Sequence, residues 1–464
     1  MASGQRKVLL LGLDCAPPEL VFDRLRDRLP NLARLMDGGI WGTLKSCIPP
    51  ITVPAWMVGM TGKDPGQLGI YGFRNRADHS YDGLAFATSG AVREPTVWDL
   101  LGRVGKRVIV GAMPPAYPPK PINGHLVTCF LTPGTKNRFT YPDSLKAEIE
   151  GLVGEYQFDV SNFRTDDKQY ILDKVYQMTE KRFRVFEYLA TTKDWDLFAA
   201  HEIGLDRMHH GFWKDFEPSH PKYVPGNPYE RFIPDYYAFV DGLVGKLLAK
   251  LPPETVVLTA SDHGVKNMYG GICINEWLLR NGYLTLKERP TEITRFEPAL
   301  VDWERTRAWG DGGYYGRLFM NVKGREPNGT IPPEDYERVR TEIIAGLCGI
   351  TSPDGVPLGT KVYRPEEVYR VARNVPPDLI VYFGDLDWRS VGSVGYDSIY
   401  TFENDTGPDD ANHSENGLYI LTDPASSARG KRGDYQIADL APTILSLFDY
   451  PIPTDIRGRV IGAQ

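Results

Sequence analysis

The stretch Thr255-Val256-Val257-Leu258-Thr259-Ala260-Ser261-Asp262-His263-Gly264 joins an apolar run to a carboxylate, an imidazole and a glycine. A short apolar run of this kind is typical of a strand that is buried on both faces of a parallel sheet. The end of such a strand brings Asp262 and His263, two metal-ligand types, to the rim of the sheet, and Gly264 permits a tight turn there. The same pair also fits a helix N-cap aspartate followed by a buried, hydrogen-bonded histidine.

Two more apolar runs lead to candidate metal ligands. Val8–Leu13 is followed by Asp14, a carboxylate that is costly to bury unless the strand end is open or a cation neutralises it. Asp206 and His210 follow another run and lie four residues apart, so on a helix they share one face and can hold one ion together. A surface helix with a solvated aspartate would carry the same residues, so the pair alone leaves both interpretations open.

Two other residues gain meaning only beside these ligands. His413 lies in a polar loop before a further apolar run, and in isolation it is an ordinary loop histidine. Thr52 follows two prolines and precedes an apolar stretch of helical character that ends near Thr61-Gly62. A hydroxyl at a helix N-terminus is most often a cap. With a metal bound to its oxygen, Thr52 would instead be an activated nucleophile, and the helix N-terminus would favour phosphate oxygens.

The composition is that of an acidic globular chain with a sizeable core. The 464 residues are 42% apolar and carry a net charge of -7 from 53 basic and 60 acidic side chains. This balance argues against a nucleic-acid scaffold or an anionic membrane surface as partner, whereas metal ions can still attract a small anionic substrate. None of the five cysteines forms a CxxC pair, which argues against a disulfide framework. No apolar run is long enough to span a membrane, so we expect a cytoplasmic location.

Short apolar runs alternate with segments of helical periodicity, which predicts an α/β protein with a largely parallel sheet covered on both faces. We expect strands at 7–13, 107–112, 125–130, 196–201, 255–260, 379–383 and 417–422. Apolar residues at three- and four-residue spacing predict helices over 171–189 and 236–251. Further helices are expected near 333–347 and 437–448.

Two stretches depart from this alternation. Residues 113–165 are rich in Pro, Gly and Tyr, and residues 286–375 carry charges and turns. We therefore expect a catalytic core formed by residues 1–285 and 376–464, with a Pro/Tyr-rich insertion at about 113–165. Residues 286–375 are expected to form an inserted cap subdomain near the rim of the active site.

The order of the candidate residues resembles that of the alkaline phosphatase superfamily, and its type I phosphodiesterase/nucleotide pyrophosphatase branch most closely. That order is Asp14, Thr52, Asp206-x-x-x-His210, Asp262-His263 and His413. Further segments resemble a prokaryotic group of predicted phosphohydrolases or phosphomutases: Thr52-Val53-Pro54-Ala55-Trp56 and residues 61–66, 69–73, 275–279, 321–326, 439–444 and 455–459. The resemblance therefore spans nearly the whole chain.

This resemblance implies a three-layer α/β/α sandwich with a mainly parallel central sheet, alkaline phosphatase-like, plus the inserted cap. It implies one metal site made of Asp206, His210 and His413, and a second made of Asp14, Asp262, His263 and Thr52. Two divalent cations, zinc first and manganese or iron as compatible choices, would lie about 4 Å apart. Thr52 would be the nucleophile of an in-line displacement and form a phospho-threonine intermediate.

Departures from the family pattern bear on the substrate. Eukaryotic nucleotide pyrophosphatases carry an asparagine soon after the nucleophile that binds a phosphoryl oxygen, and Asn75 is the nearest counterpart, at an offset register. Sulfatases of the superfamily need Cys or Ser in a Cys/Ser-x-Pro-x-Arg motif. Here the motif begins with Thr52 and lacks the arginine, so the resemblance argues against a sulfatase.

We therefore expect a metal-dependent phosphohydrolase that cleaves phosphodiester or pyrophosphate bonds in a small phosphate ester such as a nucleotide. A phosphomutase or a phosphomonoesterase using the same site stays an alternative, and so does a non-catalytic metal- and phosphate-binding protein. A diesterase would use an aromatic platform, for which the candidates are Tyr71, Phe73, Trp213, Tyr314 and Tyr315. A monoesterase would add positive charge, for which the candidates are Lys63, Arg74, Arg207 and Arg317. The sequence indicates no oligomeric state.

Overall fold

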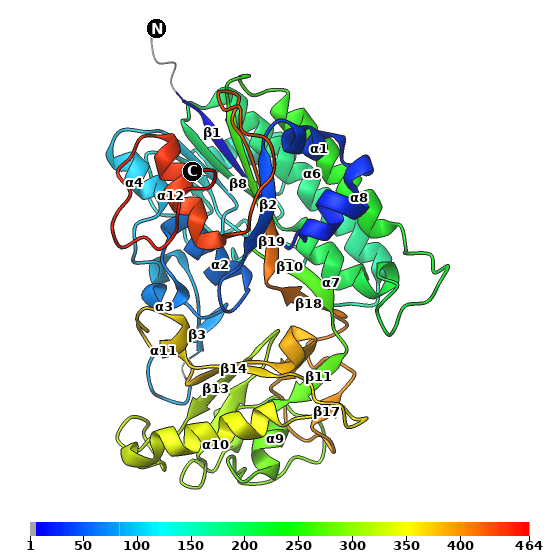
Figure 1. Cartoon of the computed structure of the whole chain (residues 1–464), viewed down its shortest axis with the longest axis vertical. Helices are drawn as coiled ribbons and strands as arrows, with labels where there is room; N and C mark the ends of the chain where they lie inside the picture. The colour runs from blue at the N-terminus through cyan, green and yellow to red at the C-terminus, as the bar shows by residue number, and fades with distance from the viewer. Residues whose placement is uncertain (1–5, 83, 464) are drawn as a thin grey trace.

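The computed structural model describes residues 6–82 and 84–463, and one large sheet lies at the centre of this part of the chain (Figure 1). Its ten described strands lie in the order β20 (Gly430–Lys431), β2 (Ile40–Lys45), β19 (Asn416–Thr422), β9 (Val256–Ala260), β1 (Val8–Leu13), β8 (Leu197–Glu202), β5 (Val108–Gly111), β6 (Gly124–Val127) and β7 (Thr140–Tyr141), with β21 (Tyr435–Gln436) beside β2. Strands β9, β1, β8, β5 and β6 run parallel, whereas β19 is antiparallel to both β9 and β2.

The residues of β1 explain why helices cover both faces of the sheet. Leu9, Leu11 and Leu13 are fully buried in one hydrophobic cluster, and Val8 and Leu10 are fully buried in another. The first cluster contains residues of α1 (Pro30–Asp37), α5 (Leu145–Val153), α6 (Lys168–Thr192), α7 (Gly204–Phe216) and α8 (Phe232–Leu248). The second contains residues of α2 (Thr52–Thr61), α3 (Pro65–Leu68), α4 (Val97–Arg103) and α12 (Leu440–Leu447). Figure 1 shows α1, α6 and α8 on one side of the sheet and α4 and α12 on the other, which confirms the predicted three-layer α/β/α fold.

The carboxyl ends of the three central parallel strands meet at one rim. Gly12 of β1 pairs with His201 of β8 and with Ala260 of β9, so the chain leaves all three strands at the same level. Asp14 follows β1 directly, Asp262 lies two residues after the end of β9, and Asp206 lies in the first turn of the helix after β8. Three carboxylates from distant parts of the sequence are thereby delivered to the same edge.

Most of the predicted elements are present with ends shifted by a few residues. The strands predicted at 7–13, 107–112, 196–201, 255–260 and 417–422 correspond to β1, β5, β8, β9 and β19. The predicted helices over 171–189 and 236–251 correspond to α6 and α8, although α8 already ends at Leu248. The Pro/Tyr-rich stretch 113–165 contributes β6 and β7 to the central sheet and α5 to a helical layer, so much of it belongs to the core.

A second, smaller unit lies beyond that rim, in the lower part of Figure 1. Its antiparallel sheet has the order β12 (Ala308–Asp311), β13 (Gly316–Met320), β15 (Leu379–Tyr382) and β14 (Lys361–Tyr363). A three-stranded sheet has the order β16 (Trp388–Val391), β11 (Gly270–Cys273) and β17 (Tyr400–Thr401). Helices α9 (Ile274–Arg280) and α10 (Tyr336–Cys348) pack on these strands, and α11 (Pro365–Val368) follows β14. The hairpin of β3 (Arg74–Arg76) and β4 (Leu84–Phe86) reaches this unit from the core, through a bridge between Arg76 and Val375.

The strand predicted at 379–383 lies in this smaller unit as β15, not in the central sheet. A buried apolar run does not reveal which sheet it joins, which explains the error. The hydrophobic cluster of the unit extends from Ile272 to Trp388. We therefore propose wider bounds for the inserted unit than the predicted 286–375.

A two-stranded antiparallel ribbon joins the two units. β10 (Gly264–Asn267) follows β9 and pairs with β18 (Ala411–Ser414), which leads back into β19. Val265 pairs with His413 in this ribbon. The region of His413, expected to be a polar loop, is thus a strand. The prediction failed because a short segment of polar residues gives no strand pattern unless its partner strand is known.

Candidate functional site

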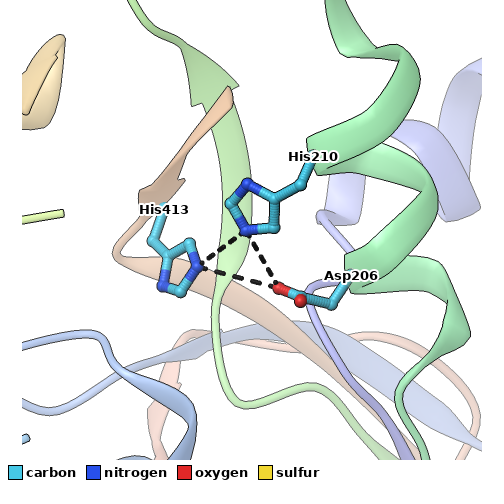
Figure 2. Close-up of side chains that lie close together, drawn as sticks. All are labelled: Asp206, His210 and His413. Atoms are coloured by element: carbon cyan, nitrogen blue, oxygen red, sulfur yellow. Dashed lines mark hydrogen bonds and ion pairs between the residues drawn. The ribbon is translucent and has the colours of Figure 1, made fainter. Parts of the chain in front are cut away.

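Asp206, His210 and His413 form the first group of candidate metal ligands (Figure 2). Asp206 and His210 lie one turn apart on α7, and His413 reaches them from β18. The Nε2 atom of His210 lies 3.3 Å from Asp206 Oδ1 and 3.2 Å from His413 Nε2. His413 Nε2 lies 3.7 Å from the same carboxylate oxygen. Three ligand atoms therefore converge on one point, as a tetrahedral metal site with an open position requires.

Asp14, Asp262 and His263 form the second group. His263 Nε2 lies 3.6 Å from Asp14 Oδ1 and 3.3 Å from Asp262 Oδ2. All three side chains are fully buried. The two groups touch, because the rings of His263 and His413 are stacked.

Each of the three histidines has its Nδ1 atom engaged on the side away from the centre. His210 Nδ1 donates to Asp409 Oδ1 at 2.9 Å, His413 Nδ1 donates to the carbonyl of Pro50 at 2.8 Å, and His263 Nδ1 donates to the carbonyl of Gly264 at 3.1 Å. A hydrogen bond at Nδ1 fixes the ring and leaves the lone pair of Nε2 for a ligand bond. The three Nε2 atoms therefore face the centre of the site, where each can offer its lone pair to a cation when it carries no proton.

The three carboxylates follow the same rule: one oxygen is held and the other is free. Asp14 Oδ2 accepts from Trp56 Nε1 at 2.9 Å and from His201 Nε2 at 2.7 Å. Asp206 Oδ2 accepts from Arg207, and Asp262 Oδ1 accepts from the Cys15 amide. Within the described chain, Asp14 Oδ1, Asp206 Oδ1 and Asp262 Oδ2 are buried without a hydrogen-bond partner of good geometry. Buried polar oxygens are rarely left unpaired. These three unpaired carboxylate oxygens, next to the three imidazole nitrogens, therefore fit two divalent cations.

The titration behaviour of these groups differs between the two clusters. Burial raises the pKa of Asp262 well above its usual range, and the nearby charge of Asp14 raises it further. Burial opposes ionisation of Asp206 too, but His210 and Arg207 outweigh it and hold the pKa well below its usual range. The carboxylates of Asp14 and Asp262 lie so close together that negative charge on both is unfavourable. A cation bound by the second ligand group would stabilise these two charges.

The imidazoles also differ. Burial lowers the pKa of His263 and of His413, so both rings are neutral and able to bind a metal near pH 7. Burial acts in the same direction on His210, but the charges of Asp409 and Asp206 outweigh it and raise the pKa to about 9. Without a cation, His210 therefore carries a proton that a metal ion must displace.

Thr52 is the first residue of α2, and its hydroxyl is not used as a helix cap. The N-cap is Ile51, and no side chain caps this helix. Thr52 Oγ1 lies 3.3 Å from His263 Nε2, and the residue is 2% exposed. Gly62 ends the helix in the left-handed conformation, with φ of 66°. The position of Thr52 thus leaves its oxygen directed at the second ligand group.

A cavity of about 760 Å³ opens between the core and the smaller unit, in front of Thr52, Asp206 and His413. Of the described residues that line it, seven are arginines and four are aspartates: Arg74, Arg76, Arg164, Arg207, Arg295, Arg317 and Arg389, with Asp159, Asp206, Asp311 and Asp405. Aromatic side chains complete the wall: Phe73, Tyr81, Phe130, Phe163, Phe296, Trp309, Tyr314, Tyr315 and Phe319. The volume is that of a ligand site, and the excess of arginine favours an anionic ligand even though the whole protein is acidic.

The structure thus brings together all seven residues that the sequence analysis selected as ligands and nucleophile, at one mouth of the sheet. Their roles stay predictions.

The candidates for substrate contacts fall into two sets, those that line the cavity and those that do not. Phe73, Tyr314, Tyr315, Arg74, Arg207 and Arg317 line the cavity, whereas Tyr71, Trp213 and Lys63 do not. Asn75 is bound within its own turn, where it accepts from the Tyr71 amide and donates to the carbonyl of Gly72. Its position lends no support to the predicted substrate role.

Several residues that hold the ligands in place escaped the sequence analysis. Asp409 orients His210, while Trp56 and His201 hold Asp14. Arg207 was considered only as a substrate contact, yet it bridges Asp206 and Asp159, with bonds of 2.7 and 2.8 Å to the latter. Asp409 could have been suspected from its place four residues before His413. The contacts of Trp56 and His201 with Asp14, and of Arg207 with Asp159, join residues far apart in sequence and have no local signal.

The sequence model described as type I phosphodiesterase / nucleotide pyrophosphatase matches residues 8–409. The chain belongs to this family of phosphoric ester hydrolases, which confirms the predicted family and class of enzyme. The matched segment ends just before His413. A GPI ethanolamine phosphate transferase 2 from Candida glabrata is 22% identical over 275 residues, which are 58% of this chain. The chain spans only 27% of the length of that transferase.

Solved structures with the same fold include human ectonucleotide pyrophosphatase/phosphodiesterase 5, with a TM-score of 0.58 and 13% identity. An inactive variant of the murine protein in complex with AMP gives a TM-score of 0.59 and 13% identity. Each comparison covers 97% of this chain and 96% of the other. At this identity the likeness establishes the fold, including the mainly parallel central sheet.

Among the described residues, no helix combines the length and apolar character needed to cross a lipid bilayer. The cytoplasmic location stays a prediction.

Proposed function

We propose that this protein hydrolyses phosphodiester or pyrophosphate bonds, with Thr52 as nucleophile beside two divalent cations. One observation carries the proposal. The Thr52 hydroxyl caps no helix and faces His263, next to three buried carboxylate oxygens that have no hydrogen-bond partner within the described chain. Membership of the type I phosphodiesterase/nucleotide pyrophosphatase family supports it.

The residues that would hold the cations are those of the two groups. Asp206, His210 and His413 would hold one, and Asp14, Asp262, His263 and the Thr52 oxygen the other. Nitrogen and oxygen ligands with three imidazoles suit zinc, and manganese or iron are compatible. When bound, such cations lower the pKa of a coordinated hydroxyl and stabilise charge on a phosphate.

Thr52 would supply the covalent step. Its Oγ1 would form a bond to phosphorus and lose its proton, while the bond to the leaving oxygen breaks and that oxygen departs as an alcohol or phosphate after taking up a proton. Water would then attack the phosphorus of the phospho-threonine, releasing the phosphate product and restoring the threonine hydroxyl. The amides of Thr52 and Val53, the first two residues of α2, would donate to the phosphate oxygens. The variant of the murine relative that is described as inactive has an alanine in place of a threonine, which is consistent with such a nucleophile.

The cavity supports a small anionic ester as substrate. Arginine forks bind phosphate oxygens, and the aromatic wall would accept the second ester group of a diester or a base. A nucleotide fits both features, and the murine relative was solved with AMP. The same arginines would also serve a phosphomonoesterase.

A second candidate is transfer of the phosphoryl group to a hydroxyl acceptor instead of water, as in a phosphomutase. The relative from Candida glabrata, named as an ethanolamine phosphate transferase, supports transfer to an acceptor other than water. Both candidates need the same ligands and differ in the acceptor that enters the cavity. A protein that only binds metal and phosphate is the remaining alternative.

A comparison of two chromogenic substrates tests the proposal. Protein loaded with zinc or manganese is incubated with bis(p-nitrophenyl) phosphate and with p-nitrophenyl phosphate. We expect faster release of nitrophenol from the diester, loss of turnover after chelation, and recovery after metal is returned. A preference for the monoester would reverse the assigned substrate class. If metal-loaded protein leaves both substrates intact, hydrolysis is wrong, and alcohol acceptors then test for transfer.

A further inference from the structure

Tyr314 brings the smaller unit into direct contact with the first ligand group. It lies in the connection between β12 and β13, next to the cavity. Its ring stacks on His210, with centroids 4.8 Å apart and planes at 17°, and on His413, with centroids 4.3 Å apart and planes at 30°. One aromatic ring from the inserted unit therefore covers both imidazoles of one candidate cation site.

The hydroxyl of Tyr314 reaches the carboxylate that orients His210. It donates to Asp409 Oδ2 at 3.1 Å and accepts from Arg164. Arg164 Nε in turn donates to the same carboxylate oxygen at 2.9 Å. With Oδ2 bound in this way, Asp409 presents Oδ1 to the Nδ1 atom of His210.

The backbone of Tyr314 is tied to the strand that carries His413. Asn412 Nδ2 donates to the carbonyl of Tyr314 at 3.0 Å and to the carbonyl of Leu386 at 2.7 Å. Asn412 Oδ1 accepts from the His413 amide at 2.8 Å. The side chain next to a candidate ligand thus binds two backbone oxygens of the smaller unit.

We propose that Tyr314 is a positioning residue for the cation site made by Asp206, His210 and His413. The inference rests on the cation site of the proposed function and adds that the inserted unit completes this site. Groups that orient metal ligands change metal affinity about 10- to 100-fold when they are removed. By linkage, a cation that binds better with Tyr314 in place also favours the docked position of its loop.

Zinc titration of metal-free protein tests the inference. It is done in the Asp262→Asn background, so that only the first ligand group is complete. Tyr314→Ala is expected to weaken zinc binding about 10- to 100-fold, and Tyr314→Phe, which keeps the ring, to weaken it less. Tyr315→Phe is the matched control: it removes the neighbouring hydroxyl, which donates to the carbonyl of Tyr71 and touches no ligand. Zinc affinity should be unchanged in this control.

Two further readouts separate positioning from general stabilisation. The visible spectrum of bound Co²⁺ reports ligand geometry and should change in Tyr314→Ala and Tyr314→Phe but not in Tyr315→Phe. Zinc should also slow amide hydrogen exchange in the segment 312–316 of the parent protein, and this protection should be lost in Tyr314→Ala.

The outcomes are distinct. If folded Tyr314→Ala binds zinc as tightly as its parent, the positioning role is wrong while the cation site stands. If the parent itself binds no zinc at this group, the cation site fails and the inference fails with it. If Tyr314→Ala does not fold, Tyr314→Phe decides, and an unchanged cobalt spectrum in that variant overturns the inference.

Discussion

His263 and His413 lie face to face, with ring centroids 3.8 Å apart and an interplanar angle of 15°. One ring belongs to each candidate cation group: His413 lies in β18 of the ribbon that joins the core to the inserted unit, and His263 directly precedes β10 of the same ribbon. The two ligand groups are therefore in direct contact, and we expect a substitution in one group to change cation binding at the other.

Replacement of Thr52 separates chemistry from metal binding. Thr52→Ala removes the proposed nucleophile and should lower turnover by more than about 1,000-fold. Zinc content should change little, because six other side chains supply ligand atoms. Thr52→Ser keeps a hydroxyl and should retain part of the activity. Steady-state kinetics with metal analysis gives the answer, and unchanged turnover in Thr52→Ala would exclude the covalent route.

Asp262→Asn is expected to have opposite effects with and without metal. Because the pKa of Asp262 is raised by burial and by Asp14, its negative charge is unfavourable in the metal-free fold above the pH at which the unfolded chain ionises, about 4. The variant should therefore melt at a higher temperature than the wild type in chelator at pH 8, and should gain less from added zinc. Thermal melts in both conditions measure this. A variant less stable than the wild type in chelator contradicts the expected repulsion.

Zinc binding at pH 7 should release a proton from His210. Its folded pKa of about 9 exceeds the value near 6.5 of an unfolded chain. The protonated ring therefore stabilises the metal-free protein fully below pH 6.5, and this contribution is lost as the pH rises through 9. Calorimetric titrations in buffers of different ionisation enthalpy count the protons released. His210→Gln should release fewer, and an unchanged count would place the displaced proton elsewhere.

Asp409 should control the strength of the first cation site without touching a cation. Asp409→Asn weakens the acceptor that orients His210 and should lower zinc affinity about 10- to 100-fold. Asp410→Asn is the matched control, since the Asp410 carboxylate pairs with Lys214 and Lys222 instead of a ligand. Equal losses of affinity in both variants would point to a general effect of charge in this segment.

The sequence predicted the central strands, and it marked Asp14, Asp206 with His210, and Asp262 with His263 as candidates, because these depend on local patterns. Thr52 and His413 were selected through the resemblance to the family, and the roles of all seven residues stay predictions. An apolar run with a carboxylate at its end is readable wherever it occurs, as in Val8–Leu13 and Asp14. β2 was missed because Ile40–Lys45 interrupts its apolar residues with Gly42 and Thr43 and gains its order only by pairing with β19.

The supporting contacts could not be predicted in the same way. Trp56 looks like a core residue, and only the fold turns its indole N–H toward Asp14. Tyr314 was proposed as an aromatic platform for substrate, but its stacking on His210 and His413 depends on how the inserted unit docks. The sequence carries no local record of that docking.

The side chains of β1 alternate between two buried clusters, and this alternation determines more than the packing of the core. A shift of its pairing by one residue would exchange the leucines that face the two helical layers, and it would also withdraw Asp14 from the mouth of the sheet. Gly12 adds a second restriction, since a Cβ atom there would lie 2.7 Å from the Trp56 ring that holds Asp14. Folding and chemistry are thus subject to one constraint in this strand: single-residue insertions or deletions before Asp14 should be as rare among active homologues as changes of Asp14 itself.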